Sequence, residues 1–190
     1  RKTDLPARSA WRARQMLNTE AKLQKLLAPT KDMIPKIEDL RVPSPAGSMW
    51  IRMYLPSPGK ELPVMVYYHG GGWVTGNPDT HDNVTRALAK HAGCVVFSVD
   101  YRLAPETPFP GPLEDCYAAL RWLHASSGEL GVDAKRIAIA GESAGAGIAA
   151  GVALMARDRG DAPICFQCLV YPMLDDRTTA DNTSPYAGEF

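Results

Sequence analysis

The sequence predicts an α/β protein with a mostly parallel sheet and flanking helices. Short apolar runs, typical of strands, alternate along the chain with longer amphipathic runs, typical of helices. The run Val64–Tyr68 is apolar throughout, as expected for a central strand covered on both faces. Glycine-rich segments directly follow two predicted strands, Val64–Tyr68 and Ile137–Ala140. Parallel sheets bind ligands beyond the carboxyl ends of their strands, so these two segments are the candidate site.

The chain divides into an N-terminal helical segment, residues 1–35, and a core, residues 36–190. Apolar residues recur among charged ones up to about Leu27, and Ala28-Pro29 and Ile34-Pro35 end that pattern. About six strands are expected in the core: Ile37–Val42, Trp50–Leu55, Val64–Tyr68, Cys94–Val99, Ile137–Ala140 and Cys165–Tyr171.

Three helices are expected between these strands, at Thr80–His91, Leu113–His124 and Ala144–Arg157. The third is rich in alanine and glycine, which suits close packing on a sheet, and Gly160 is its expected stop. The apolar positions of the first two are Val84, Ala87, Leu88 and His91, and Leu113, Cys116, Tyr117, Leu120 and Leu123.

Composition indicates an ordinary globular protein. Of 190 residues, 45% are hydrophobic and 22% charged, and 21 Lys and Arg balance 21 Asp and Glu. That balance argues against nucleic acid or an anionic membrane as the main partner. No apolar run is long enough for a membrane span, and the N-terminus lacks the apolar stretch of a signal peptide. We expect a cytoplasmic protein, with a removed signal peptide as the alternative.

Two of the four cysteines form a C-x-x-C, which raises the question of a metal or redox site. Cys165 and Cys168 fall in a predicted strand, where residues three apart point to opposite faces, whereas redox pairs begin helices. We therefore expect buried small residues here, and no metal or other cofactor.

Ser143 is the candidate nucleophile. Gly141-Glu142-Ser143-Ala144-Gly145 matches G-x-S-x-G and lies between a predicted strand and a predicted helix, as that motif requires. A sharp turn there lifts the serine hydroxyl into the open, and the helix N-terminus favours developing negative charge. An ordinary Gly/Ser turn is the alternative.

The segment 69–73, His-Gly-Gly-Gly-Trp, is the candidate oxyanion loop. Consecutive glycines suit a backbone whose N–H groups approach a ligand oxygen. The expected donors are the N–H groups of Gly71, Gly72 and Ala144, while Gly70 shapes the turn and His69 supports the loop. A flexible turn is one alternative; a phosphate loop is disfavoured because no Lys-Ser/Thr follows. Structural or solvent roles are expected for the remaining histidines: His81, His91 and His124.

Together these motifs resemble the hormone-sensitive-lipase-like group of α/β-hydrolases, especially its bacterial carboxylesterases. HGGGW at 69–73, DYRLAPE at 100–106, GESAG at 141–145 and Tyr171-Pro172 stand in order. The resemblance implies an α/β-hydrolase fold and hydrolysis of small, short-acyl carboxylic esters through a Ser143 acyl-enzyme, with no metal or cofactor.

The resemblance also assigns architectural roles. It implies that Arg102 and Glu106 tie together the loops beneath the oxyanion segment by charge-assisted hydrogen bonds. The N-terminal helices of such enzymes contribute to a cap over the acyl pocket. Apolar residues of that segment then face substrate, or they pack on the body of the domain: Met16, Leu17, Leu23 and Leu26.

The chain departs from the family pattern after Ser143. The order in this fold is Ser, then Asp or Glu, then His, but all four histidines precede Ser143. We therefore expect a fold that is incomplete at the C-terminus, with the last two strands and the triad's acid and base absent. Such a fragment is expected to be inactive and unstable as a monomer. A non-hydrolytic small-molecule-binding homologue and an inactive fragment are the alternatives; the oligomeric state stays open, with a homodimer as one possibility.

Overall fold

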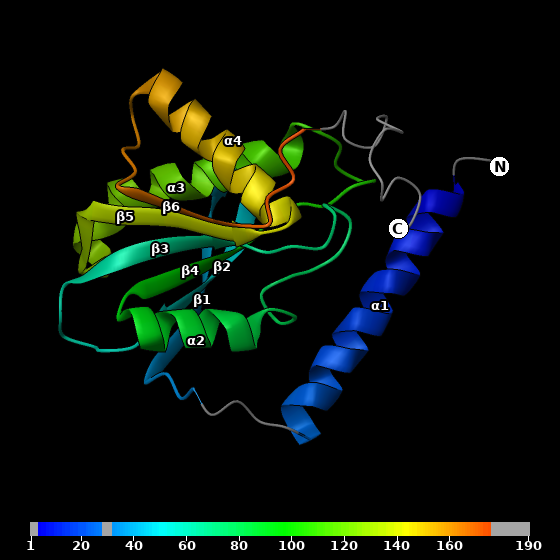
Figure 1. Cartoon of the computed structure of the whole chain (residues 1–190), viewed down its shortest axis with the longest axis horizontal. Coiled ribbons are helices and arrows are strands. Elements are labelled where there is room, and N and C mark those ends of the chain that lie inside the picture. Colours follow the sequence, from blue (N-terminus) through cyan, green and yellow to red (C-terminus); the bar gives the residue numbers. More distant parts are fainter. Residues whose placement is uncertain (1–3, 28–31, 176–190) are drawn as a thin grey trace.

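The computed structural model describes residues 4–27 and 32–175, which form a six-stranded sheet with helices around it (Figure 1). The helices are α1 (Asp4–Leu27), α2 (Asp82–Ala92), α3 (Gly111–Leu130) and α4 (Ala144–Arg159). The strands are β1 (Lys36–Ser44), β2 (Gly47–Leu55), β3 (Leu62–Tyr68), β4 (Val95–Asp100), β5 (Val132–Glu142) and β6 (Phe166–Val170). Each expected strand and helix is confirmed, with boundaries shifted by a few residues.

The sheet is mostly parallel, as predicted. Its order is β1-β2-β4-β3-β5-β6; β1 and β2 join antiparallel, and β4, β3, β5 and β6 run parallel. The central strand β3 lies between β4 and β5, with Tyr68 opposite Gly141. Because neighbouring parallel strands end at the same edge, the segments that follow β3 and β5 start side by side.

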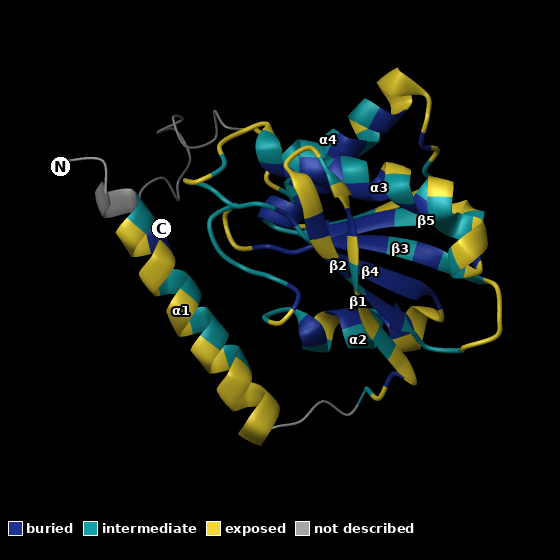
Figure 2. Ribbon diagram, turned by 180° about the vertical axis from the view of Figure 1, so that it is seen from behind, coloured by how far each residue is buried: buried dark blue, intermediate teal, exposed yellow. Residues whose placement is uncertain are grey.

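Helices cover both faces of the sheet: α2 lies on one face, α3 and α4 on the other (Figure 1). Alternation along β3 divides the core accordingly. Val64, Val66 and Tyr68 join the larger apolar cluster with α3 and α4, whereas Met65 and Tyr67 belong to the cluster beneath α2. The strands at the centre are almost entirely buried (Figure 2).

The end of α4 follows its sequence signal. Gly160 adopts a left-handed conformation, with φ of 69°, and its N–H donates to Ala156 O at 2.9 Å. This is the expected glycine stop.

The face that α2 buries agrees with the predicted one only in part, because Leu88 packs against the cluster beneath the helix. Thr85 and Ala89 are buried, whereas Val84 is 41% exposed and His91 is exposed. The helix begins at Asp82, whose buried carboxylate accepts a hydrogen bond from Tyr54 Oη at 2.9 Å. This contact to β2 turns Thr85 and Ala89, rather than Val84 and His91, toward the sheet.

The interpretation of the C-x-x-C as buried small residues is wrong. Cys165 is exposed, Cys168 is half-buried, and both are free thiols. The reason is that β6 begins at Phe166 and pairs only with β5, so it is an edge strand within the described part of the chain. Phe166 is 61% exposed at that edge.

Helix α1 stands apart from the sheet and crosses the loops that follow β3 and β4 (Figures 1 and 2). Met16, Leu23 and Leu26 are each more than half exposed, so the alternative that they pack on the body is wrong for the described residues, while Leu17 is half-buried. Neither α1 nor any other helix among residues 4–27 and 32–175 is long and apolar enough to span a membrane.

Candidate active site

Ser143 lies in a tight turn between β5 and α4, in a backbone conformation that residues with side chains rarely adopt. Its φ is 52° and its ψ is −119°. Its N–H donates to Val170 O at 2.9 Å, and its carbonyl accepts from the Gly147 and Met173 N–H groups at 3.1 and 3.3 Å. Such strained conformations persist only where the surroundings enforce them, and they concentrate at functional sites. Here hydrogen bonds to β6, to the segment after it and to α4 hold the turn.

The small residues around Ser143 are required by close packing of backbone on backbone. A Cβ built on Gly141 would lie 2.5 Å from the carbonyl carbon of Gly145. One built on Gly145 would overlap the Tyr68 carbonyl oxygen and lie 2.5 Å from that of His69. The pattern G-x-S-x-G is therefore a steric requirement at this place, where α4 starts against the end of β3.

The glycine loop, residues 69–73, begins at the end of β3 beside this turn. Gly71 has a φ of 118° and Gly72 one of 62°, and a Cβ on Gly71 would lie 2.7 Å from the carbonyl carbon of Thr75. The Gly71 carbonyl turns back into the loop, where it accepts from the Val74 and Thr75 N–H groups at 3.1 and 2.9 Å. Because C=O and N–H point in opposite directions across a trans peptide, the Gly72 N–H points out of the turn.

His69 is buried at the base of the glycine loop. Its Nδ1 donates to Gly70 O at 2.8 Å, and its ring stacks on that of Tyr101 at 4.2 Å. The Tyr101 hydroxyl donates to His69 O at 2.6 Å. Burial lowers the pKa of His69 to about 3, so its imidazole is neutral at physiological pH.

The structure brings the predicted site residues to one sheet edge, but it places no histidine on Ser143. Ser143 Oγ has a weak contact with Met173 Sδ at 3.7 Å, and among the described residues no hydrogen bond joins it to an imidazole. His124 Nε2 lies 2.9 Å from Pro163 O, and His91 lies beside Asp32. Ala144, the third predicted donor, is the buried first residue of α4.

Arg102 and Glu106 each form a charge-assisted contact with a helix. Arg102 binds Asp115 of α3 through Nε and Nη2 at 2.7 and 2.9 Å. Glu106 instead accepts from Arg14 of α1 at 2.8 and 3.0 Å. Both form charge-assisted hydrogen bonds, as expected, but these tie the loop to two helices.

Arg14 is a residue that the sequence analysis missed. Besides Glu106, its guanidinium donates to Val74 O at 2.7 Å and to Ala104 O at 2.6 Å. It therefore joins α1 to the end of the glycine loop and to the loop after β4. One arginine in a helix with many charges gives no signal of such a role in the sequence.

A mostly apolar cavity of about 600 Å³ opens beside the Ser143 turn. Trp73 of the glycine loop and Met173, the residue in contact with Ser143 Oγ, both line it. Its remaining lining residues are Ala104, Thr107, Phe109, Pro112, Leu113, Gly147, Ile148 and Gly151.

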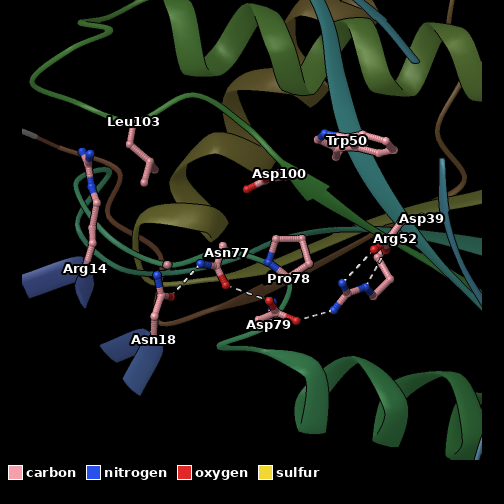
Figure 3. A pocket seen from close by; sticks show the side chains of 11 residues that line it. Arg14, Asn18, Asp39, Trp50, Arg52, Asn77, Pro78, Asp79, Asp100 and Leu103 are labelled. Atoms are coloured by element: carbon pink, nitrogen blue, oxygen red, sulfur yellow. Dashed lines mark hydrogen bonds and ion pairs between the residues drawn. The ribbon is translucent and has the colours of Figure 1, made fainter. Parts of the chain in front are cut away.

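A second cavity, of about 410 Å³ and lined largely by charged and amide side chains, lies between α1 and the sheet (Figure 3). Within it Arg52 bridges Asp39 at 2.6 Å and Asp79 at 2.7 Å. Asp100 also lines this cavity, and burial raises the pKa of its carboxyl group to about 6. No group of three or more His, Cys, Asp or Glu among the described residues could hold a metal ion.

These features define a class. Residues 65–189 match the sequence profile of the alpha/beta hydrolase fold family, and the chain belongs to that family. The fold, the Ser143 turn and the glycine loop agree with the expected resemblance to hormone-sensitive-lipase-like carboxylesterases.

Named relatives are esterases. The chain is 52% identical over 136 residues to carboxylesterase NlhH of Mycobacterium tuberculosis, covering 71% of this chain and 41% of that protein. It is 49% identical over 140 residues to esterase LipI of the same organism, covering 72% and 44%. The chain thus spans less than half the length of these curated relatives.

The solved structures that superpose on this chain include esterases. A hyperthermophilic esterase from the archaeon Pyrobaculum calidifontis superposes with a TM-score of 0.81 at 44% identity, covering 86% of this chain and 53% of that one. A bacterial heroin esterase superposes with a TM-score of 0.80 at 41% identity, covering 87% and 53%.

Proposed function

We propose that this chain carries the nucleophile and the oxyanion loop of a carboxylesterase that hydrolyses small, short-acyl esters through a Ser143 acyl-enzyme. The observation that carries the proposal is the positive φ of Ser143 at the start of α4, beside the glycine loop. The pairing of Tyr68 with Gly141 supports it, because it starts both segments at one sheet edge.

The proposed chemistry is acyl transfer. Ser143 Oγ attacks the ester carbonyl, and the alcohol leaves as the acyl-enzyme forms. The N–H groups of Gly71, Gly72 and Ala144 stabilise the tetrahedral oxyanion, and removal of one such donor raises the barrier by roughly 3–4 kcal/mol in comparable enzymes. Water then releases the acid.

The general base is proposed to be a histidine that follows Ser143 in the full-length protein, oriented by an Asp or Glu between them. Three observations support this. His69 is neutral and donates to Gly70 O, and His81 lies beside Glu142. In addition, this chain spans about half the length of the solved relatives.

The apolar cavity supports the substrate class. Its volume of about 600 Å³ suits a small molecule, and its apolar walls suit an acyl or alcohol group without charge. Helix α1 is proposed to belong to a cap above this site, a role supported by its contacts to the loops after β3 and β4.

Covalent labelling tests the proposal. A fluorophosphonate probe is expected to label the wild-type full-length protein at Ser143, and p-nitrophenyl butyrate to be hydrolysed. Labelling and hydrolysis are both expected to be lost in Ser143→Ala. Both are expected to be retained in Ser127→Ala, because the Ser127 hydroxyl donates to His124 O within α3, away from the candidate site. Absence of both labelling and turnover in the wild-type protein would favour a non-hydrolytic binding protein, and labelling that survives Ser143→Ala would refute the proposal.

A further inference from the structure

The side chain of Glu142, the residue before Ser143, contacts both parts of the candidate site. Its Oε1 lies 2.9 Å from His81 Nε2, at the start of α2. A Cβ built on Gly70 would lie 3.2 Å from Glu142 Cγ, so this side chain packs on the glycine loop. Its Oε2 accepts from the Tyr171 hydroxyl at 3.3 Å. Glu142 is therefore placed between the Ser143 turn, the glycine loop and α2.

His81 in turn contacts the base of the glycine loop. Its ring stacks on that of His69, with centroids 5.3 Å apart and planes at 29°. On its other side Nδ1 lies 2.9 Å from Thr80 Oγ1 and 3.3 Å from Asn77 O. The ring is thus held at both nitrogens and on one face.

The contact between His81 and Glu142 has a defined polarity. A carboxylate only accepts hydrogen bonds, so Nε2 carries the hydrogen and donates it. Both side chains are largely shielded, at 16% and 24% exposed, which strengthens a charge-assisted bond relative to one in water.

We propose that Glu142 and His81 are positioning residues that set the place of Ser143 Oγ relative to the N–H groups of the glycine loop. The inference rests on the proposed esterase function. Neither residue lines the apolar cavity, so neither contacts the substrate there. Loss of their contact therefore lowers kcat, which depends on the geometry of attack, and leaves KM nearly unchanged.

Steady-state kinetics of the full-length protein test this inference. In Glu142→Ala and His81→Ala, kcat is expected to fall on the order of 10- to 100-fold, as for small misplacements of reacting groups. Glu142→Gln, whose amide oxygen still accepts from Nε2, is expected to recover part of the loss. The double alanine variant is expected to lose no more than the worse single variant, because both remove one contact.

Each control changes the same residue type, histidine or glutamate, at a place outside the contact between His81 and Glu142. His91→Gln changes a histidine near the other end of α2, and Glu38→Gln removes a carboxylate paired with Lys36 on β1. Both are expected to keep wild-type kcat. Unchanged kcat in both alanine variants, multiplying losses in the double variant, or a rise in KM alone would overturn the inference.

A second measurement separates this inference from the proposed function. If the wild-type protein hydrolyses no ester, amide hydrogen exchange over residues 69–76 and 141–145 still reports the contact. Faster exchange in Glu142→Ala and His81→Ala, but not in Glu38→Gln, supports the positioning role. Unchanged exchange in both segments overturns it.

Discussion

Gly145 faces the carbonyl oxygen of Tyr68 at a separation that leaves no room for a methyl group. A Cβ there would also lie 2.5 Å from the His69 carbonyl oxygen, so backbone atoms at the end of β3 would have to move. Gly145→Ala is therefore expected to lower the free energy of unfolding by about 3 kcal/mol, the upper range for overpacking.

The matched control is Gly128→Ala within α3, where a Cβ would meet nothing within 4 Å. This change is expected to raise the free energy of unfolding by about 0.5–1 kcal/mol, since alanine loses less backbone entropy than glycine in a helix. Chemical denaturation of both variants gives the two values. A similar effect of both changes would show that close approach to β3 does not govern position 145.

Strain at Ser143 predicts an unusual order of stabilities. At a φ of 52° a Cβ is unfavourable, so Ser143→Gly is expected to be more stable than Ser143→Ala by about 1 kcal/mol, although both lose the nucleophile. At Ser127, inside α3, the order is expected to reverse by about 1 kcal/mol, because glycine disfavours helix. Thermal melts of the four variants test this; the same order at both positions would contradict the strain.

The half-buried carboxyl of Asp100 predicts a pH-dependent stability. Burial raises its pKa to about 6 in the folded protein from 3.8, so the folded state binds this proton more tightly than the unfolded state does. Stability from this group is present below pH 4 and is lost as the pH rises through 6. Asp100→Asn is therefore expected to stabilise the protein at pH 7 by on the order of 2–3 kcal/mol.

Asp79, in the same cavity, is the control, because its pKa is shifted in the opposite direction. The hydrogen bond from Arg52 lowers its pKa, so its stabilising effect is present above pH 4 and fades on acidification. Asp79→Asn is expected to destabilise the protein at pH 7 and to have a smaller effect at pH 3. Urea denaturation between pH 3 and 8 distinguishes the two; parallel pH profiles would show that Asp100 titrates normally.

Arg14 predicts how firmly α1 is held. Its guanidinium donates to the Val74 and Ala104 carbonyls and to the Glu106 carboxylate. Arg14→Ala removes these bonds, so amide hydrogen exchange in α1 is expected to quicken on the order of tenfold. Arg12→Ala, an exposed arginine of the same helix, is the control and should leave exchange unchanged. Equal exchange in the two variants would place the attachment of α1 elsewhere.

Features encoded in short stretches of chain were predictable. The solid apolar run at β3 and the alternation of strands with helices indicated a mostly parallel sheet, which the structure confirms. The motifs at 69–73 and 141–145 were located by residue type and by the strands before them. Their roles in catalysis stay predictions.

Features that depend on a partner far along the chain were not predictable in this way. The buried face of α2 was predicted only in part: Leu88 packs on the sheet, but Thr85 and Ala89 rather than Val84 are buried, and Asp82 contacts Tyr54. Cys165 was expected to be buried, but the position of β6 at the sheet edge exposes it.

Sequence alone therefore identified the α/β class, the Ser143 turn and the glycine loop, because backbone conformation and steric need act over a few neighbouring residues. Tertiary structure decided which side chains surround them. The contacts of Arg14 with Val74 and Ala104, and of His81 with Glu142, depend on strand register and on how helices pack against the sheet. A hydrogen bond forms only when both groups meet within about 3 Å, and no local pattern specifies that meeting for distant residues.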